Sequence, residues 1–330
     1  MRSTGVLLLN LGGPDSLKAV RPFLYNLFSD RLIIKLGPAF LQRPLAALIA
    51  LMRSPKTRRM YKLIGGASPI RELTSVQAKA LQARLDSECT PDGCNNIKVY
   101  VGMRYWRPFI EDAIKEAYTD GVHRLIALSL YPHYSLATAG SAFTELERVL
   151  KAYPMKCEYI RNWPQNSFYV EALAGSIRDT IDEDCDGVDS GNCHILMSAH
   201  GLPVYFIKNG DPYLDELNKT IESVKKRLPN LTYHLSFQSR SGPVKWLTPS
   251  TEDMIRQLAK QGVRRLVIVP ISFVSDHIET LYEIDILYKD FALKRGIILK
   301  RVKPLNDNPL FIEALKSLVE KTLVDNANDR

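Results

Sequence analysis

Residues 193–203, CHILMSAHGLP, contain a short apolar run, CHILM at 193–197, and a polar side chain, His200, three residues after its end. A second run, LVIV at 266–269, leads into PISFVSDHIETLYE at 270–283. Short apolar runs rich in branched residues are typical of strands buried in a parallel sheet. Open α/β sheets bind ligands beyond the carboxyl ends of such strands. We therefore predict an α/β fold in which His200 and three acidic residues, Asp276, Glu279 and Glu283, meet at one sheet edge if the two strands are neighbours.

Imidazole and carboxylate together suit a divalent transition metal, so this group is a candidate metal site. Two simpler interpretations stay open. A lone histidine after a strand is more often a hydrogen-bonded loop residue, and Asp276 with Glu279 has the spacing of a capping box at a helix start. Capping does not account for Glu283, which lies four residues after Glu279 on the same helical face.

The length and composition indicate a globular protein with two domains. The chain has 330 residues, of which 45% are hydrophobic and 24% charged. The five cysteines form no CxxC pair, and their odd number argues against a disulfide framework. The N-terminal run GVLLLN at 5–10 is too short for a signal peptide and is predicted to be the first strand. We expect a cytoplasmic protein.

An internal repeat organises the chain. The pattern EDAIKEA followed by GVHRLIAL at 121–128 recurs as EDMIRQL followed by GVRRLVIV at 262–269. A second similarity pairs LLLNLGGP at 7–14 with ILMSAHGLP at 195–203. Each half alternates strands with helices, which predicts two similar doubly wound, Rossmann-like lobes with parallel sheets that face each other across a cleft. We place the lobes at 1–155 and 156–330. A capped helix is predicted at 309–325, and the sequence leaves open on which of the two lobes it packs.

The first half contains an insert, at about 30–71, that carries the excess charge of the chain. The net charge is +8, yet the nine Lys and Arg residues from Arg31 to Arg71 have no acidic residue among them. Apolar runs in the same segment are broken by Pro38 and Pro44 and are far shorter than the roughly 20 residues that span a bilayer. The insert predicts either contact with anionic lipid at the inner face of the membrane or a mouth for an apolar ligand that bears carboxylates. Two ordinary core helices with solvated basic faces are the alternative.

Several function classes lose support. Neither GxGxxG nor GxxxxGK[ST] occurs, so we expect no nucleotide partner. No GxSxG or HExxH motif is present, which disfavours common hydrolases. Aromatic residues are not interleaved with the basic ones, which disfavours nucleic acid.

The chain resembles the ferrochelatase family over nearly its whole length. The resemblance rests on LNLGGP at 9–14, IGGASPI at 64–70, MRYWRP at 103–108, YPHYS at 131–135, SAHGLP at 198–203, GDPY at 210–213, FQSRSGPVKWL at 237–247 and VPISFVSDHIETLYEID at 269–285. It implies two doubly wound lobes and the insertion of ferrous iron into protoporphyrin IX, the last step of haem synthesis. Iron is then a substrate, and no tightly bound cofactor is expected.

The resemblance also implies roles for individual residues. His200 and Glu279 face the centre of the macrocycle and the metal, and Glu283 and Asp276 belong to the acidic helix face. The other residues that it assigns to the substrate pocket are Asn10, Arg104, Tyr105, Trp246 and Phe273 in its lining, Arg53, Lys56, Ser68 and Ser239 near the porphyrin propionates, and Tyr61 at a further position. Whether His200 acts as base or as ligand is left open.

Three departures refine the expectation. Leu287 occupies the place of a third carboxylate in the acidic row, so a relay would be shorter. Leu136 and a C-terminus without cysteine predict that no [2Fe–2S] cluster of the animal type is present. Leu11-Gly12-Gly13 resembles the protoporphyrin-using branch more than the coproporphyrin-using one. The alternatives are a coproporphyrin enzyme, a cobalt or nickel chelatase of another tetrapyrrole, and a non-catalytic porphyrin or haem carrier.

Overall fold

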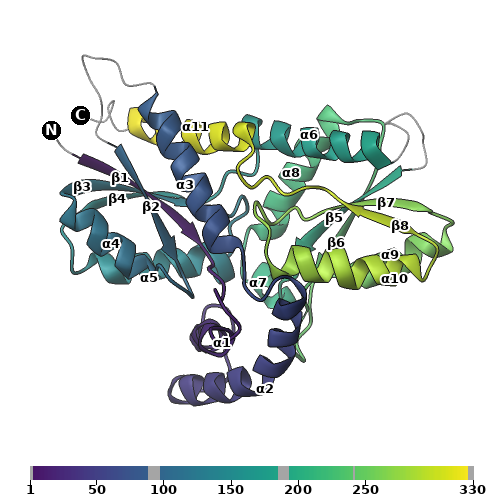
Figure 1. The fold of residues 1–330 in the computed structure, drawn as a ribbon, viewed down its shortest axis with the longest axis horizontal. Coiled ribbons are helices and arrows are strands. Elements are labelled where there is room, and N and C mark those ends of the chain that lie inside the picture. Colours follow the sequence, from purple (N-terminus) through teal and green to yellow (C-terminus); the bar gives the residue numbers. More distant parts are fainter. Residues whose placement is uncertain (1–2, 88–96, 185–192, 241, 326–330) are drawn as a thin grey trace. The chain divides into compact units, whose positions relative to one another are not determined.

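The computed structural model describes residues 3–87, 97–184, 193–240 and 242–325, and within them it has two four-stranded parallel sheets (Figure 1). The strand orders are β2-β1-β3-β4 and β6-β5-β7-β8. The chain divides into two compact units, one formed by 1–163 with 306–330 and the other by 164–305. Each unit contains one of the sheets, as the alternation of strands and helices predicts.

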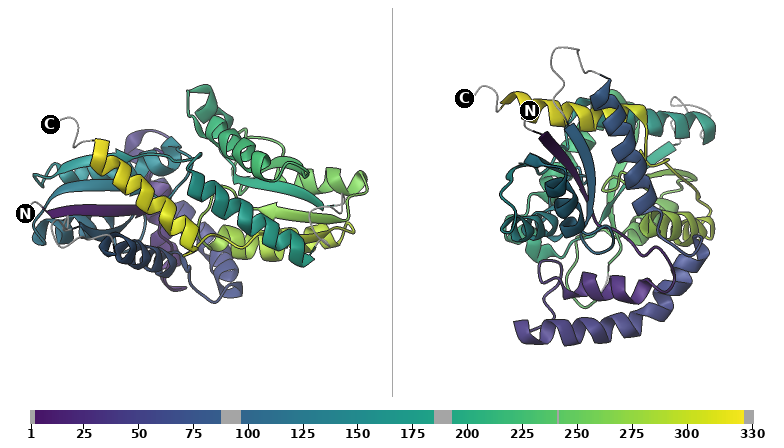
Figure 2. Two further views of the ribbon diagram at one scale, coloured as in Figure 1. Left: turned by 90° about the horizontal axis from the view of Figure 1, so that it is seen from above. Right: turned by 60° about the vertical axis from the view of Figure 1, so that its left-hand side comes forward.

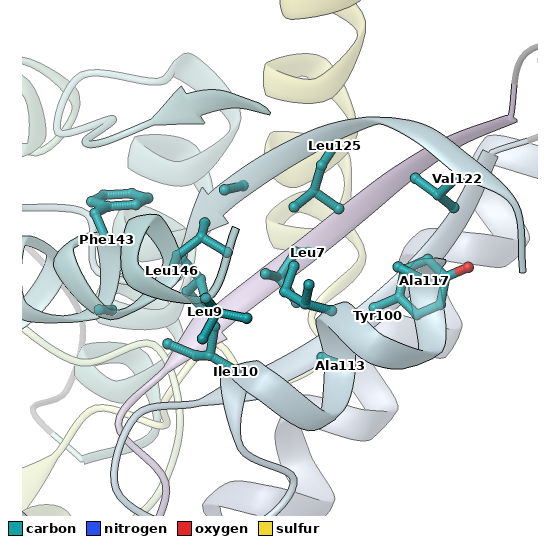
Figure 3. Packing of buried hydrophobic residues seen from close by; sticks show 14 of the residues in the cluster. Leu7, Leu9, Tyr100, Ile110, Ala113, Ala117, Val122, Leu125, Phe143 and Leu146 are labelled. Carbon is teal, nitrogen blue, oxygen red and sulfur yellow. The ribbon is translucent and has the colours of Figure 1, made fainter. Parts of the chain in front are cut away.

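The first unit places helices on both faces of its sheet (Figure 1). Its strands are β1 (Ser3–Asn10), β2 (Ile97–Met103), β3 (Val122–Ser129) and β4 (Lys156–Ile160). Its helices are α1 (Val20–Ser29), η1 (Ala39–Leu41), α2 (Gln42–Leu63), α3 (Ile70–Asp86), α4 (Ile110–Thr119), the π-helical η2 (Leu136–Gly140), α5 (Ser141–Leu150) and α11 (Pro309–Asp325). Figure 3 shows how the core forms, with Leu7 and Leu9 of β1 directed at Ile110 of α4 and at Phe143 and Leu146 of α5.

The second unit repeats this arrangement with its own set of elements. Its strands are β5 (Cys193–His200), β6 (Thr232–Gln238), β7 (Arg265–Val269) and β8 (Ile298–Arg301). Its helices are α6 (Ser167–Asp184), α7 (Val204–Lys208), α8 (Tyr213–Arg227), α9 (Thr251–Lys260), the π-helical η4 (Glu279–Tyr288) and α10 (Lys289–Leu293). Its core joins Leu196 and Ile268 of the sheet to Ile255 and Leu258 of α9.

The two sheets confirm the internal repeat. In each, the first strand in sequence lies second in the sheet, between the second strand and the third. The repeated sequence pattern forms α4 and β3 in one unit and α9 and β7 in the other. The sequence did not reveal β4 and β8, because these edge strands are short and only partly apolar.

The division into units differs from the predicted one in two places. The first unit extends to Trp163, beyond residue 155, because β4 pairs with β3 in the first sheet. The C-terminal helix α11 also belongs to the first unit and not to the second half in which the sequence placed it. It packs against α3 (Figure 2), and Arg84 of α3 pairs with Glu313 of α11 at 2.7 Å. The predicted cap is present, since the Leu310 amide donates to Asn308 Oδ1.

Within the insert, one long helix runs through Pro44, which separates two apolar runs in the sequence. α2 runs through 22 residues from Gln42 and includes Pro44 and Pro55. Pro44 is tolerated because the first turn of a helix has no intrahelical partner for its amides. No helix in the described part of the chain is both long and apolar enough to cross a membrane.

A buried histidine in the YPHYS segment predicts acid sensitivity. His133 is 2% exposed, and burial lowers the pKa of its imidazole from 6.5 to about 3. Because the pKa of His133 is lower in the folded state than in the unfolded state, its neutral form contributes fully to the free energy of unfolding above pH 6.5. This contribution, on the order of 4 kcal/mol, is lost as the pH falls toward 3.

The test is acid unfolding of His133→Asn, whose side chain cannot be charged. We expect its unfolding midpoint to lie at lower pH than that of the parent, whereas His123→Asn, at an exposed position of β3, should leave the midpoint unchanged. Equal midpoints for all three proteins would contradict the assignment.

Candidate active site

The carboxyl edge of the second sheet brings His200 to an acidic helix. His200 is the last residue of β5, and β5 pairs in parallel with β7, as predicted. The chain leaves β7 at Val269 and enters η4 at Glu279. There His200 Nδ1 lies 2.7 Å from Glu279 Oε2, with side-chain exposures of 32% and 18%. Imidazole and carboxylate therefore form a hydrogen-bonded pair that is partly open to solvent.

A single serine hydroxyl joins the two glutamates of η4. Ser239 Oγ lies 3.1 Å from Glu279 Oε2 and 2.6 Å from Glu283 Oε2. The side-chain amide of Gln238 donates a hydrogen bond to the backbone carbonyl oxygen of Glu279 at 3.1 Å. Glu279 and Glu283 therefore face the same neighbour, as their spacing predicts. The resemblance assigns Ser239 to the propionates, but in the structure its hydroxyl is bound to these carboxylates.

The backbone at Ser239 is strained to achieve this contact. Its φ of 62° lies in the left-handed region, which is unfavourable for residues with a Cβ atom. The strain places the hydroxyl just beyond the end of β6, between the two carboxylates.

Two variants separate the strain from the hydrogen bonds. Ser239→Ala and Ser239→Gly both remove the hydroxyl, but only glycine relieves the left-handed backbone. We expect Ser239→Gly to be more stable than Ser239→Ala by about 1 kcal/mol in urea unfolding. Equal stability of the two variants would show that the backbone conformation at residue 239 carries no strain.

The charges in this cluster are strongly coupled. Burial disfavours the charged imidazole of His200, but the Glu279 carboxylate outweighs burial and raises the His200 pKa. Burial would likewise raise the pKa of Glu279, yet His200 and then His277 hold that pKa well below its usual range. Burial and the neighbouring Glu279 raise the pKa of Glu283 to about 7. The cluster therefore holds one firmly ionised carboxylate, Glu279, beside an imidazole whose pKa is raised and the Glu283 carboxyl group, whose pKa is about 7.

A second histidine, which the sequence did not single out, supports Glu279. His277 is buried, its Nδ1 lies 3.0 Å from the Ser275 carbonyl oxygen, and its Nε2 lies 3.9 Å from Glu279 Oε2. The Phe273 ring contacts both imidazoles, with centroids 4.2 Å from His277 and 6.1 Å from His200. The tetrapeptide DHIE at 276–279 could have indicated His277, because a histidine two positions before Glu279 can contact its carboxylate.

Asp276 is engaged in a structural ion pair. Its Oδ1 accepts the Thr280 hydroxyl at 2.8 Å and lies 3.1 Å from Arg301 Nη1. Arg301 also makes a two-point contact with Asp285. η4 begins at Glu279 as a π-helix with Ile278 at its N-cap position, so Asp276 is not the N-cap residue that the capping-box alternative requires.

Trp246 is bound to the segment that follows His200. Trp246 makes an antiparallel bridge with Pro203, three residues after His200. Its indole Nε1 is buried, and in the described part of the chain it has no hydrogen-bond partner. The backbone carbonyl of His200 accepts the Tyr213 hydroxyl at 3.0 Å, which fixes the chain at this point.

In the first unit, the predicted residues Arg104 and Tyr105 share a buried partner, Asp30. Asp30 Oδ2 accepts Arg104 Nη2 at 2.9 Å, the Tyr105 hydroxyl at 2.7 Å and the Ser141 hydroxyl. Its other oxygen accepts the Leu32 amide at 2.8 Å. The Asp30 side chain is only 5% exposed and that of Arg104 21%. Asp30 thus ties the start of the insert to the end of β2, a function the sequence did not reveal.

The remaining buried residues of the predicted set lie near the end of β1. Asn10 ends this strand, and its side chain donates to Thr74 Oγ1 at 3.0 Å and accepts the Leu11 amide at 2.8 Å. Ser68 lies so close to Gly13 that a Cβ there would be 2.5 Å from the Ser68 hydroxyl oxygen, which explains the glycine. Tyr61 is buried near the end of α2.

Two predicted basic residues stand on the outside of α2. Arg53 and Lys56 are both exposed, and the Arg53 guanidinium lies 5.4 Å above the Phe28 ring of α1. No group of three or more His, Cys, Asp or Glu side chains in the described ranges is arranged to hold a metal ion. Hydrogen bonds, some of them through Ser239, join His200, Glu279 and Glu283 into one cluster.

Comparison with known proteins identifies the family. The family profile described as Ferrochelatase matches residues 3–323. A ferrochelatase from Geotalea uraniireducens (strain Rf4) is 50% identical over 323 residues, which cover 97% of this chain and 98% of that one. The chain belongs to the ferrochelatase family. A ferrochelatase from Desulfotalea psychrophila is 46% identical over 324 residues and covers 98% of both chains.

Solved structures agree with the ferrochelatase assignment at the level of the fold. SirB from Bacillus subtilis with Fe3+ has a TM-score of 0.57 at 13% identity, covering 99% of this chain and 98% of that one. The sirohydrochlorin chelatase SirB from Bacillus subtilis subspecies spizizenii, in complex with cobalt, has a TM-score of 0.55 at 10% identity, covering 97% and 95%. The predicted chelatase-like α/β fold is confirmed.

Proposed function

We propose that this ferrochelatase-family enzyme inserts ferrous iron into protoporphyrin IX to form protohaem, and that the His200–Glu279–Glu283 cluster performs the insertion. The observation that carries the proposal is the 2.7 Å contact between His200 Nδ1 and Glu279 Oε2 at a partly open sheet edge. A porphyrin or haem carrier needs no proton acceptors at this position. Ionisable groups with strongly perturbed pKa values are typical of catalytic sites.

Proton transfer sets the requirements of the reaction. The free-base porphyrin gives up two pyrrolic protons as Fe2+ enters, so the product carries the iron and the site receives two protons. His200 Nδ1 is bound to Glu279, which leaves Nε2 as the nitrogen that meets the substrate. His200, whose pKa is raised by Glu279, accepts one proton, and Glu283, whose pKa is raised to about 7, accepts the other.

Iron is a substrate in this account and has to leave the protein with the porphyrin. One imidazole and one or two carboxylates suit a divalent iron that keeps open coordination positions. His200 and Glu279 are the proposed first contacts, and Glu283, held by Ser239, relays protons behind them. The carboxylate of Asp276 is bound to Arg301, so Asp276 is proposed to act indirectly, by holding Arg301 and the start of η4 in place.

Further residues of each unit are proposed to contact the macrocycle. Phe273 and Trp246 are the proposed walls in the second unit, and Asn10, Arg104 and Tyr105 are those in the first. The propionates are assigned to Arg53, Lys56 and Ser68, and Tyr61 is assigned to a further position of the pocket. Ser239 acts on the carboxylates of η4 instead.

No tightly bound cofactor, nucleotide or nucleic acid enters the reaction as proposed. An animal-type [2Fe–2S] cluster is not expected, because Leu136 stands in the YPHYS region and the C-terminal helix α11 has no cysteine. Cys89, Cys94 and Cys185 lie outside the described residues.

The insert is proposed to bind the inner face of the membrane, with the protein otherwise cytoplasmic. Phe40 of η1 is 77% exposed and Met52 of α2 62%, and the basic residues of the insert near them are those of α2. Each Lys or Arg near an anionic surface contributes about 1 kcal/mol, which high salt weakens. We expect the protein to co-sediment with anionic vesicles at low salt, with a small salt-resistant remainder from the apolar side chains.

Charge variants test this attachment. The insert variant carries Gln at four exposed positions, Arg43, Arg53, Arg58 and Arg59. The control variant carries Gln at four exposed positions of the second unit, Lys219, Lys226, Lys260 and Lys289. Only the insert variant should lose binding. Equal binding to neutral and anionic vesicles, or equal loss in both variants, would contradict a lipid-binding insert.

The activity is tested by anaerobic incubation with Fe2+ and either protoporphyrin or coproporphyrin. We expect many turnovers of protoporphyrin, seen as replacement of the free-base bands by those of protohaem, and slower turnover of coproporphyrin. Faster turnover of coproporphyrin would assign the other branch. Tight porphyrin binding without turnover would identify a carrier, and turnover only with Co2+ or Ni2+ would identify another chelatase.

A further inference from the structure

A second pair of imidazoles lies on neighbouring strands of the second sheet. His194 is near the start of β5 and His234 is near the start of β6, which is an edge strand. His194 Nδ1 lies 2.9 Å from His234 Nε2, and the two ring planes differ by 5°. Both side chains are partly exposed. The pair is held by the sheet itself, because β5 and β6 pair in register from His194 to His200.

This pair is far from the proposed active site. His194 and His200 are six residues apart on one strand, and a rise of about 3.3 Å per residue separates them by about 20 Å. The histidines lie at the amino ends of the strands, whereas His200, Ser239 and η4 lie at the carboxyl ends. An ion bound at one place would not touch the ligands of the other.

The geometry of the pair is close to that of two ligands of one metal ion. A tetrahedral zinc ion with Zn–N distances of 2.0–2.1 Å holds two nitrogens about 3.3 Å apart. To bind one ion, His194 Nδ1 and His234 Nε2, now 2.9 Å apart, need to separate by a few tenths of an ångström. Each ring also needs to turn toward the ion, and β6, which carries His234, is an edge strand. The His200–Glu279 pair has a similar hydrogen-bonded separation of 2.7 Å.

The protonation state also favours a ligand role. Burial lowers the pKa of His194, and burial with the nearby His194 lowers that of His234. Both rings are thus neutral at pH 7, the form that binds metal. One ring donates its proton to the other in the present hydrogen bond. On metal binding that ring carries its proton on the opposite nitrogen, so no proton is released and the charge of the pair is unchanged.

We propose that His194 and His234 form a second site for a divalent transition metal, with two imidazole ligands and water in the remaining positions. Imidazole ligands suit Zn2+, Cu2+ and Ni2+, and the affinity order favours Cu2+ and then Ni2+ or Zn2+ over Fe2+. The site does not depend on the proposed reaction.

The test is equilibrium dialysis of the full chain against Zn2+ alone. His234→Gln and His194→Gln are each expected to weaken one zinc site at least about 10-fold. His123→Gln, an exposed histidine on β3, is the matched control and should bind zinc like the parent. His200→Ala separates the two sites, because it should affect only the zinc bound at η4.

Unchanged zinc binding in both His194 and His234 variants would overturn the proposal. An equal loss in His123→Gln would overturn it too, since binding would then be a general property of surface histidines. If the variants unfold, the parent chain still gives an answer. Substoichiometric Co2+ should broaden the imidazole proton NMR signals of His194 and His234 before those of His123. Broadening of the His123 signals first would contradict the site.

Discussion

His200→Ala is expected to lower the rate of iron insertion roughly 10²- to 10⁴-fold without unfolding the protein, because loss of a positioned base has an effect of that size. Its imidazole is bound to Glu279 at 2.7 Å, and its side chain is 32% exposed. Glu279→Ala should cause a loss of similar order, because it removes the proposed metal contact and the carboxylate that raises the His200 pKa.

The measurement is the steady-state rate of protohaem formation under anaerobic conditions. His123→Ala, at an exposed position on β3, is the control and should keep the parent rate. A rate for His200→Ala within threefold of the parent would exclude His200 as base and as metal contact. A comparable loss in the control would point to a general effect of histidine removal.

Asp30→Ala is expected to destabilise the first unit by about 3 kcal/mol, because it removes a buried carboxylate that binds three side chains and leaves the partly buried guanidinium of Arg104 without its counter-charge. The Tyr105 and Ser141 hydroxyls lose the same acceptor. Asp30→Asn should cost less, since the amide oxygen still accepts a hydrogen bond, but the charge of Arg104 remains unpaired.

The measurement is calorimetric unfolding of both variants and the parent. Asp15→Ala is the matched control: its carboxylate is 42% exposed and lies 3.9 Å from Arg71, so we expect a change below about 0.5 kcal/mol. An Asp30→Ala variant as stable as Asp15→Ala would show that the buried network contributes nothing to the fold.

The parts of the site that could be predicted from sequence are those set by strand ends. His200 and Glu279 follow two apolar runs, and parallel neighbours place their carboxyl ends together. The repeat also predicted two similar sheets. The contact of Ser239 with two glutamates could not be predicted, because neither this contact nor the left-handed backbone leaves a local pattern in the sequence. Asp30 was missed because its partner Arg104 is 74 residues away.

Local rules misled the prediction where long-range contacts decide the structure. Asp276 and Glu279 match a capping box, but Arg301 binds Asp276 from β8, and η4 begins as a π-helix. The C-terminal helix is amphipathic and could cover either sheet. Its place in the first unit follows from contacts such as that of Arg84 with Glu313, which are 229 residues apart.

A single-turnover experiment tests the central claim most directly. Protein in excess is loaded with protoporphyrin without air and then mixed with Fe2+, and the free-base absorption bands are followed for the parent and for His200→Ala. The account predicts that both proteins bind protoporphyrin, that the parent converts all of it to protohaem, and that His200→Ala leaves the free base unchanged over the same time. Conversion at the parent rate by His200→Ala, or bound protoporphyrin that stays metal-free in the parent, would contradict it.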